Sequence, residues 1–411
     1  MSYTRLLLLL LLLITLLPLH AAAHGPDDPN AASFEQNTPT DSQPLAYTPL
    51  AITPIPQVQQ LINQVDVDHL LGYARELSGE TPALINGQSV TIPTRSTYSG
   101  AHLQNAVQYM SERLQRLGLT VTTHTWNASY APNIIAEKPG LDPTAGIVIL
   151  CAHLDSTSPS GATLAPGADD NGSGSVAVLQ AAELMAPYHF NATVRFILFT
   201  GEEQGLLGST AYANAVAGQD IRGVLNMDMI AWDNQGGPDM DLHARSSVAG
   251  SVSLGTLYAD VINAYALPLI PVIYGNGSSA SDHSPFWNIG VPAILAIENY
   301  NADIAAPRDF NAYYHSVNDR VSAFNTTFFR TMTQASLATF IHMAGLNTTC
   351  YWADLDCSGL VDVLDLSQVA SSWQAGSGQW NYSLAYDPDV NGTVDVLDIQ
   401  RFAAEWGWAG K

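Results

Sequence analysis

Basic residues are scarce in this chain of 411 residues. It carries 14 Lys and Arg against 37 Asp and Glu, which gives a formal net charge of −23. Nucleic acids are polyanions that bind proteins through basic side chains, so this balance argues against a nucleic-acid partner. Clustered acids can instead hold hard cations. We therefore expect a protein that does not bind nucleic acid, in which groups of acids are candidate cation sites.

Long apolar runs are missing after the first twenty residues. At the start, Arg5 precedes a largely apolar stretch over 6–17, and the small residues 21–23 supply a cleavage signal. This stretch is too short for a membrane helix and is typical of a secretory signal peptide. We expect residues 1–23 to be removed. The mature protein would then be secreted (extracellular or periplasmic) and would have no contact with a membrane.

Cysteine is also rare, since only Cys151, Cys350 and Cys357 occur. An odd count leaves at least one thiol free. Cys151 ends an apolar run, so we expect a buried core thiol there. Cys350 and Cys357 are close in sequence and the expected compartment is oxidising, but the sequence leaves open whether they form a disulfide.

The organisation of the chain follows from its apolar patterns. Residues 24–60 are rich in Pro, Asn, Thr, Gln and Ser and predict a linker or pro-segment without a core. Between 61 and 348, buried strands alternate with amphipathic helices. Strands are expected at 145–153, 193–200, 223–229 and 291–298, and helices at 174–188, 253–265 and 328–345. This alternation predicts an α/β fold, with a mostly parallel central sheet flanked by helices.

Acids and imidazoles follow the expected strands at the points where loops cross the carboxyl edge of such a sheet. These residues are His153, Asp155, Asp169, Asp170, Glu202, Glu203, Asp228 and His315, and Tyr314 directly precedes the last of them. Loops at that edge converge, so we expect these side chains to meet at one site. Imidazoles mixed with carboxylates suit zinc, and the number of acids suggests two ions bridged by a carboxylate.

Five motifs carry a resemblance to a known family. In order they are HLDS, GADDNGSG, GEEQGLLGS, NMDM and YYHSVND, over about residues 150–320. In this order and spacing the chain resembles the secreted co-catalytic zinc aminopeptidases, such as the bacterial leucyl aminopeptidases. The resemblance implies that His153 and Asp228 hold one zinc, that Glu203 and His315 hold the other, and that Asp170, not Asp169, bridges them.

The resemblance also implies roles for residues that do not hold metal. Glu202 would be the general base and would later protonate the leaving amine. Asp155 would orient His153. Tyr314 would donate its phenol hydrogen to the developing oxyanion. The stretch YGNGSSASDHSPFW lacks the cysteine of some relatives, and His283 within it is the main rival to His315 as a ligand.

The last sixty residues contain an internal repeat. DLDCSGLVDVLD and DPDVNGTVDVLD start 33 residues apart and match a calcium-loop template, with a helix after each loop. The expected calcium ligands are Asp354, Asp356, Ser358, Asp365, Asp387, Asp389, Asn391 and Asp398. Val361 and Val394, at equivalent loop positions, are expected to pair the two loops. The duplicated pattern over 350–408 resembles dockerin modules, a small all-α type, and implies a cohesin-type protein partner.

These patterns together predict a secreted zinc aminopeptidase that acts on peptides with a free N-terminus. It would carry two Zn²⁺ ions in the main domain and Ca²⁺ in the C-terminal repeats. One alternative is a glutaminyl cyclase-like enzyme of the same fold with a single zinc. Another is a catalytically inactive binding protein of that fold, but such a protein should lack ligands or the base, whereas this chain has both.

Overall fold

The computed structural model describes residues 43–48, 52–300, 309–376, 379 and 381–409. The expected signal peptide, residues 1–23, and most of the expected linker lie outside these ranges. Within them, no helix combines the length and the apolar character that crossing a membrane requires.

Ten α-helices and ten strands are described in these ranges. The helices are α3 (Pro56–Asn63), α4 (Val67–Leu77), α5 (Ala101–Arg116), α6 (Gly174–Met185), α7 (Leu207–Ala215), α8 (Ser251–Ala264), α9 (Ser284–Asn288), α10 (Thr326–Ala344), α11 (Val363–Ser371) and α12 (Val396–Ala404). The strands are β1 (Ala83–Ile85), β2 (Gln88–Val90), β3 (Thr120–His124), β4 (Asn133–Lys138), β5 (Ile147–His153), β6 (Thr193–Phe199), β7 (Ile221–Met227), β8 (Asp239–His243), β9 (Ile270–Tyr274) and β10 (Ala293–Glu298).

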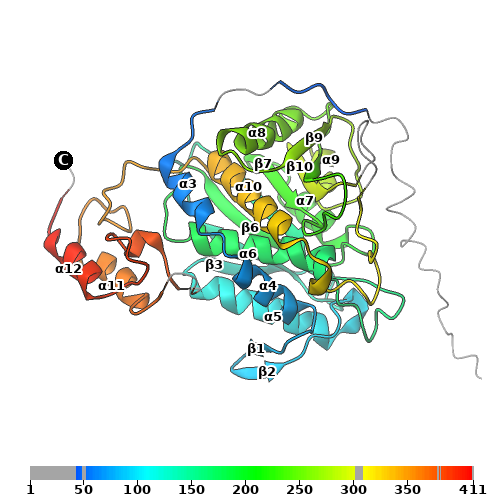
Figure 1. Ribbon diagram of the computed structural model, residues 1–411, viewed down its shortest axis with the longest axis horizontal. Coiled ribbons are helices and arrows are strands. Elements are labelled where there is room, and N and C mark those ends of the chain that lie inside the picture. The colour runs from blue at the N-terminus through cyan, green and yellow to red at the C-terminus, as the bar shows by residue number, and fades with distance from the viewer. Residues whose placement is uncertain (1–42, 49–51, 301–308, 377–378, 380, 410–411) are drawn as a thin grey trace, which may run out of the picture.

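Eight of these strands form the central sheet, in the order β3-β4-β6-β5-β7-β10-β8-β9 (Figure 1). The neighbours β6, β5, β7 and β10 run parallel to one another. The outer pairs β3-β4, β4-β6 and β10-β8 are antiparallel, whereas β8-β9 is parallel. The sheet is therefore mixed, with a parallel centre whose carboxyl ends share one edge.

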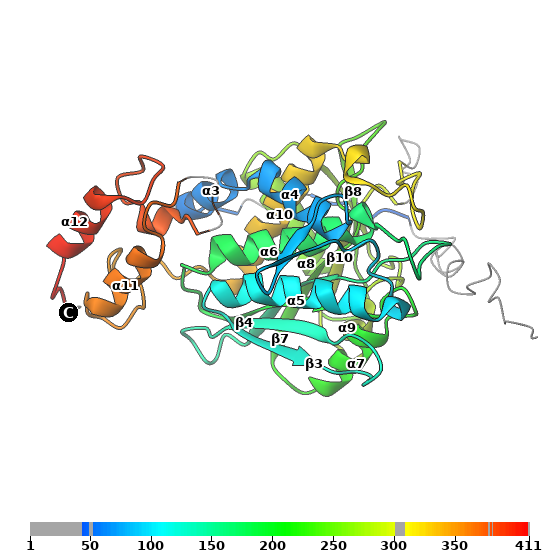
Figure 2. The same cartoon turned by 90° about the horizontal axis from the view of Figure 1, so that it is seen from below.

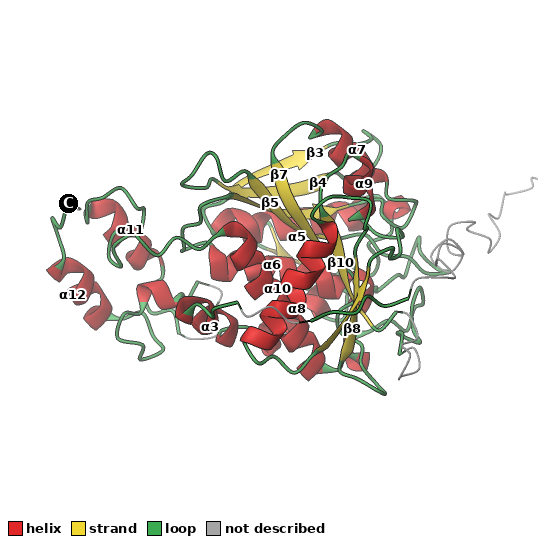
Figure 3. Cartoon of the chain, turned by 90° about the horizontal axis from the view of Figure 1, so that it is seen from above, coloured by secondary structure: helices red, strands yellow, loops and turns green. Residues whose placement is uncertain are grey.

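Helices cover both faces of this sheet (Figure 2, Figure 3). Along β5, the side chains of Val148 and Leu150 belong to the large core under α5, α6, α8 and α10. The alternating residues Ile149 and Cys151 belong to a second core with Tyr212 of α7 and Phe286 of α9. Successive side chains of a strand point to opposite faces, so β5 must be apolar throughout, and this explains its unbroken apolar run.

The expected α/β architecture is confirmed, and two details differ from expectation. Helix α3 begins at Pro56 and buries Val58 against the main core, so the prediction of a linker is wrong for residues 56–60. The apolar runs of the sequence do not predict strands β3, β4, β8 and β9. They are the outer strands of the sheet, and β3 is largely exposed, with polar threonines that give no apolar run.

The C-terminal repeats form a small helical unit with its own apolar core, which includes Val361, Val394 and Phe402 (Figure 1). The expected pairing between Val361 and Val394 is wrong. The Val361 N–H donates to the carbonyl of Trp408, beyond α12, at 2.9 Å. The Val394 N–H donates to the carbonyl of Ala375, beyond α11, at 2.8 Å. Each loop therefore pairs with the segment that follows the helix of the other repeat.

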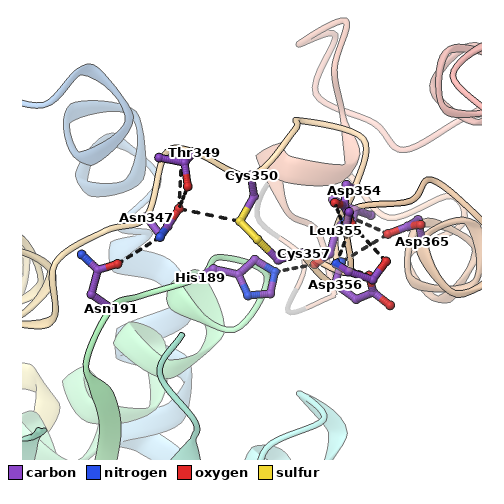
Figure 4. The surroundings of a disulfide bond; sticks show 12 residues. His189, Asn191, Asn347, Thr349, Cys350, Asp354, Leu355, Asp356, Cys357 and Asp365 are labelled. Atoms are coloured by element: carbon purple, nitrogen blue, oxygen red, sulfur yellow. Dashed lines mark hydrogen bonds between the residues drawn. A yellow bond between two sulfur atoms is a disulfide. The ribbon is translucent and has the colours of Figure 1, made fainter. Parts of the chain in front are cut away.

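This C-terminal unit contacts the main domain beside the first repeat (Figure 4). Cys350 and Cys357 form a disulfide, while Cys151 is a free and fully buried thiol. His189 Nε2 contacts the carbonyl oxygen of Leu355 at 2.6 Å. The disulfide thus lies at the junction and closes a short loop that contains the start of the first repeat.

Candidate metal centre

The candidate site residues lie at the carboxyl edge of the parallel strands. His153 is the last residue of β5, and Asp228 directly follows β7. Glu202 and Glu203 follow β6, and Asp170 lies in the turn 168–173 that leads into α6. His315 comes from the loop beyond β10. Because β6, β5, β7 and β10 are parallel neighbours, their loops converge as the sequence predicts.

Asp170 lies between the two imidazoles. Its Oδ1 is 3.3 Å from His153 Nε2, and its Oδ2 is 3.1 Å from His315 Nε2. His153 Nε2 is also 3.3 Å from Asp228 Oδ1, and His315 Nε2 is 3.0 Å from Glu203 Oε2. We call the place beside His153 and Asp228 the first metal position, and the place beside Glu203 and His315 the second metal position.

The donor atoms fit a pair of divalent cations. The groups His153, Asp170, Asp228 and Asp170, Glu203, His315 each offer ligand atoms within 4.8 Å of one another. Within the described part of the chain, Glu203 Oε1 is buried and has no hydrogen-bond partner. A buried carboxylate oxygen without a partner is costly unless a cation or a proton satisfies it. Oxygen and imidazole donors shared through one carboxylate are the set that a zinc pair uses.

The electrostatics of the site favour positive charge on both imidazoles. Burial alone would lower their pKa values. For His153 the charges of Asp228 and Glu202 outweigh burial and raise the pKa well above its ordinary value. For His315 the charge of Glu203 and a hydrogen bond to Asp170 raise the pKa to about 10. The same field would stabilise divalent cations in place of those protons.

The carboxylates differ in how strongly they hold their protons. Burial would raise the pKa of Asp170, but hydrogen bonds from both imidazoles outweigh it and lower the pKa. Burial raises the pKa of Glu203 to about 7. Burial also raises the pKa of Glu202 well above its ordinary value, and the charges of Asp282 and Asp228 add to this effect. Glu202 Oε2 lies 4.0 Å from His153 Nε2, so this carboxyl group is placed beside the metal positions.

Tyr314 stacks on His315, with the ring centroids 3.6 Å apart. Burial raises the pKa of its phenol, and the nearby charges of Asp170 and Glu203 raise it further. The phenol therefore keeps its proton at neutral pH and is able to donate a hydrogen bond.

Asp155 contacts other groups than expected. His153 Nδ1 is 3.1 Å from the backbone carbonyl of Asp155, whereas the nearest carboxylate oxygen is 3.8 Å away. The carboxylate instead accepts the backbone N–H groups of Glu202 at 3.2 Å and Glu203 at 3.3 Å, and the hydroxyl of Thr97 at 3.1 Å. Its backbone orients the imidazole, while its side chain holds the turn that carries the two glutamates.

His283 does not join the cluster. Its Nε2 is 2.9 Å from the carbonyl of Ser278, its ring packs edge-on against Trp287, and burial lowers its pKa to about 3. The geometry thus favours His315 over His283 as a ligand. Asp282, next to it, is fully buried, and burial raises its pKa to about 7.

Several supporting residues had no role in the sequence prediction. The Ser281 hydroxyl donates to Asp228 Oδ2 at 2.6 Å and accepts from Asn226 Nδ2 at 2.8 Å, so Asp228 Oδ1 is turned toward His153. Asn226 lies in the motif NMDM and Ser281 lies in the stretch YGNGSSASDHSPFW, so their nearness to these motifs was the sequence signal that could have identified them. Arg95 is fully buried and donates to four backbone carbonyls, including those of Leu154 and Gly167. Arg95 precedes all five motifs and belongs to none of them, so the sequence did not indicate its role.

The two C-terminal loops each gather acids. Asp354, Asp356 and Asp365 offer oxygens within 4.8 Å of one another, and so do Asp387, Asp389 and Asp398. Gly359 and Gly392 both have φ of 86°, which an L side chain rarely adopts, so glycine permits the turn. Ser358 and Asn391 lie in these loops and donate their backbone N–H groups to Asp354 and Asp387, respectively.

Comparison with known proteins agrees with the geometry of the main domain. Leupeptin-inactivating enzyme 1 of Streptomyces exfoliatus is 32% identical over 240 residues, which cover 54% of this chain and 51% of that protein. Aminopeptidase Y of Saccharomyces cerevisiae is 32% identical over 215 residues, which cover 51% of this chain and 38% of that protein. The chain thus spans about half or less of the length of these curated relatives.

Solved structures share the fold of the main domain, and a sequence model of one protein family matches it. The LapA aminopeptidase of Legionella pneumophila superposes with a TM-score of 0.60 at 19% identity, over 73% of this chain and 78% of that one. The glutaminyl cyclase of Porphyromonas gingivalis superposes with a TM-score of 0.51 at 18% identity, over 67% of this chain and 98% of that one. The model of peptidase family M28 matches residues 133–340, which include all five residues of the two metal positions. On this match over half of its length, the protein belongs to peptidase family M28.

Proposed function

We propose that this protein is a secreted aminopeptidase that uses two zinc ions to hydrolyse the N-terminal residue of peptides. One observation carries the proposal: the two oxygens of Asp170 face His153 Nε2 at 3.3 Å and His315 Nε2 at 3.1 Å. A carboxylate in that place can bridge two cations. His153 and Asp228 would complete the first metal position, and Glu203 and His315 the second.

Zinc bound there would polarise the scissile carbonyl and lower the pKa of an attacking water. The chain supplies the proton transfers. Glu202 takes the proton of the water, because its carboxylate is buried beside the metal positions and its raised pKa favours protonation. The same carboxyl then returns the proton to the leaving amine. Tyr314, protonated and stacked on His315, donates to the oxygen on which negative charge develops.

Peptides with a free N-terminus are the proposed substrates. The support is the family match and the names of the relatives, among them Aminopeptidase Y of Saccharomyces cerevisiae and probable leucine aminopeptidase 2 of Aspergillus oryzae. A strongly negative protein whose centre holds several acids also suits the cationic α-amino group of such a peptide.

The test is hydrolysis of a panel of aminoacyl chromogenic amides, with and without a chelator, together with elemental analysis of the purified protein. We expect two zinc ions per chain and chelator-sensitive release of the chromophore. N-terminally acetylated versions of the same amides are the matched control and should not be cleaved. Two bound zinc ions without hydrolysis of any unblocked amide would contradict the proposed activity.

A glutaminyl cyclase is the rival function, because one such enzyme shares the fold. It would hold one zinc and would cyclise peptides with N-terminal glutamine without cleaving them. Zinc counting and product mass distinguish the two, since cyclisation releases ammonia whereas hydrolysis adds water and splits the peptide. A binding protein of this fold would show neither product.

The C-terminal unit is proposed to bind two calcium ions through Asp354, Asp356, Ser358 and Asp365 in the first loop and Asp387, Asp389, Asn391 and Asp398 in the second. The clustering of the acids within 4.8 Å supports this proposal. The exposed apolar side chains of the C-terminal unit suit binding of a protein partner, and we propose a cohesin-type domain as this partner. Val363, Leu364, Val396 and Leu397 are all more than half exposed at the equivalent helix starts of the two repeats.

A further inference from the structure

The loop that carries His315 is hydrogen-bonded to the Asp169–Asp170 turn at two points, one before and one after His315 in the sequence. We call these two contacts the fastenings. Asn311 makes the contact before His315, and Asp319 makes it after. This arrangement matters because Asp170 and His315 come from segments far apart in the sequence, which no shared strand or helix holds together. Something else must fix the 3.1 Å between Asp170 Oδ2 and His315 Nε2.

The first fastening is a hydrogen bond between side chains. Asn311 is 3% exposed, and its Nδ2 donates to Asp169 Oδ2 at 2.9 Å. Its Oδ1 accepts the backbone N–H of Tyr313 at 2.8 Å, which shapes the approach to His315. The Asn311 backbone N–H donates to Glu298 Oε1 at 2.9 Å, so the end of β10 is part of the same contact.

The second fastening runs from a side chain to the backbone. Asp319 is 1% exposed, and its carboxylate accepts the N–H groups of Asp169 and Asp170, each at 3.0 Å. The Ala168 N–H donates to the backbone carbonyl of Asp319 at 3.2 Å. The turn that presents Asp170 is therefore held by three hydrogen bonds to the far end of the His315 loop.

His315 itself needs this support. Its φ is 53°, in the left-handed region that residues other than glycine adopt rarely and at an energetic cost. Such a backbone persists only when the surrounding structure determines it. His153 and Asp228, by contrast, lie at the ends of the adjacent strands β5 and β7 and do not depend on this loop.

We propose that Asn311 and Asp319 are positioning residues that hold His315 against Asp170 and so tune the second metal position without touching the first. The inference rests on the proposed two-zinc function. The predicted consequence is selective. Loss of either fastening should weaken zinc at the second position by about 10–100-fold, the usual effect of removing a group that orients a ligand, and should leave the first position within about threefold of its original affinity.

The test compares Asn311→Ala with Asn318→Ala, which makes the same change at an exposed position of the same loop. Zinc affinities of both positions are measured on the full chain by competition with a chromophoric chelator. Thermal unfolding of the zinc-loaded proteins is recorded in parallel. We expect one tight and one weakened zinc in Asn311→Ala, and two tight zinc ions in Asn318→Ala.

Two further variants keep the test decisive if Asn311→Ala does not fold. Asn311→Ser keeps an oxygen for the Tyr313 N–H but is too short to reach Asp169, so it removes the fastening and spares the local turn. The double variant Asp169→Asn/Asn311→Asp reverses the direction of the hydrogen bond. It should recover zinc affinity at the second position to within about fivefold of the wild type, whereas each single change should not.

Three outcomes would overturn the proposal. They are unchanged zinc affinities in Asn311→Ser, equal weakening of both positions, and a double variant no better than its single changes. A wild-type chain that binds fewer than two zinc ions would instead refute the proposed two-zinc function, so the two failures are distinguishable.

Discussion

The carboxylate of Asp155 accepts the backbone N–H of Glu202 at 3.2 Å, and its second oxygen accepts the N–H of Glu203 at 3.3 Å. We expect Asp155→Asn to lower kcat by about 10–100-fold while both zinc ions stay bound, because an amide group cannot accept both donors. The imidazole of His153 would still be held by the backbone carbonyl. Thr97→Val, which removes only a hydroxyl donor to Asp155, is the milder control. Loss of zinc from Asp155→Asn would show that the carboxylate orients His153 after all.

Replacement of the proposed general base should separate chemistry from metal binding. Glu202→Gln preserves shape but cannot take a proton, so kcat should fall by about 10²–10⁴-fold with two zinc ions retained. Steady-state kinetics and elemental analysis check both parts. Glu112→Gln makes the same change on α5, where the side chain contacts Asn86 and Gln108, and should leave kcat unchanged. Full peptidase activity in Glu202→Gln would exclude this residue as the base.

Zinc removal should destabilise the main domain. Without cations, the acids around Asp170 lose their neutralising partners, and a ligand present at 1,000 times its Kd stabilises the folded state by about 4 kcal/mol. We expect a zinc-selective chelator, added with calcium in excess, to lower the unfolding temperature and abolish activity, and added zinc to restore both. An unchanged unfolding temperature would indicate that zinc does not bind the folded centre.

Calcium should bind the C-terminal unit at two sites. Isothermal titration calorimetry of the zinc-loaded full chain should give two calcium ions per chain. Asp365→Asn removes the negative charge of a clustered acid in the first loop and should weaken one site by at least about tenfold. Ser367→Ala, a change two residues further along the same helix, is the control. Equal calcium binding in both variants would contradict the proposed ligand set.

Acid should destabilise the protein through buried neutral histidine. Burial, with the charges of His243 and Arg245 adding to its effect, lowers the pKa of His283 from 6.5 to about 3. Between about pH 3 and pH 6.5, His283 is neutral in the folded state and becomes protonated when the protein unfolds. The free energy of unfolding therefore falls as the pH drops from about 6.5 toward 3. His283→Gln can still donate to Ser278 but does not titrate. It should reduce this loss by about 3 kcal/mol at pH 4, measured by urea unfolding with zinc chelated in both proteins. If the free energy of unfolding of the wild type and of His283→Gln depended on pH in the same way, His283 would not be the group responsible.

Sequence patterns predicted the parallel centre of the fold because its strands are buried on both faces. An unbroken apolar run such as the one that ends at Cys151 is a direct consequence of two-sided burial. Among the outer strands, β3 is largely exposed, so its threonines resemble a polar loop, whereas β4 and β8 are mostly buried and this reason does not apply to them. The convergence of His153, Asp170, Glu203, Asp228 and His315 could be anticipated for the same reason, since parallel strands bring their loops to one edge.

Hydrogen-bond partners could not be predicted in this way. The Asp155 carboxylate contacts the N–H groups of Glu202 and Glu203 more closely than the imidazole of His153 by differences in distance of less than 1 Å, which no motif specifies. Asn311 and Asp319 act through backbone and side-chain contacts across more than 140 positions of sequence. The polar composition of residues 24–60 predicts a linker that includes the start of helix α3, although Val58 in this helix is fully buried. These details arise from tertiary packing.

The crossed pairing within the C-terminal unit makes its two halves interdependent. Loop one is completed by residues that follow α12, and loop two by residues that follow α11, so neither repeat has a full set of backbone partners alone. Removal of the residues just after α12 would therefore leave the first loop, which belongs to the other repeat, without its backbone partners.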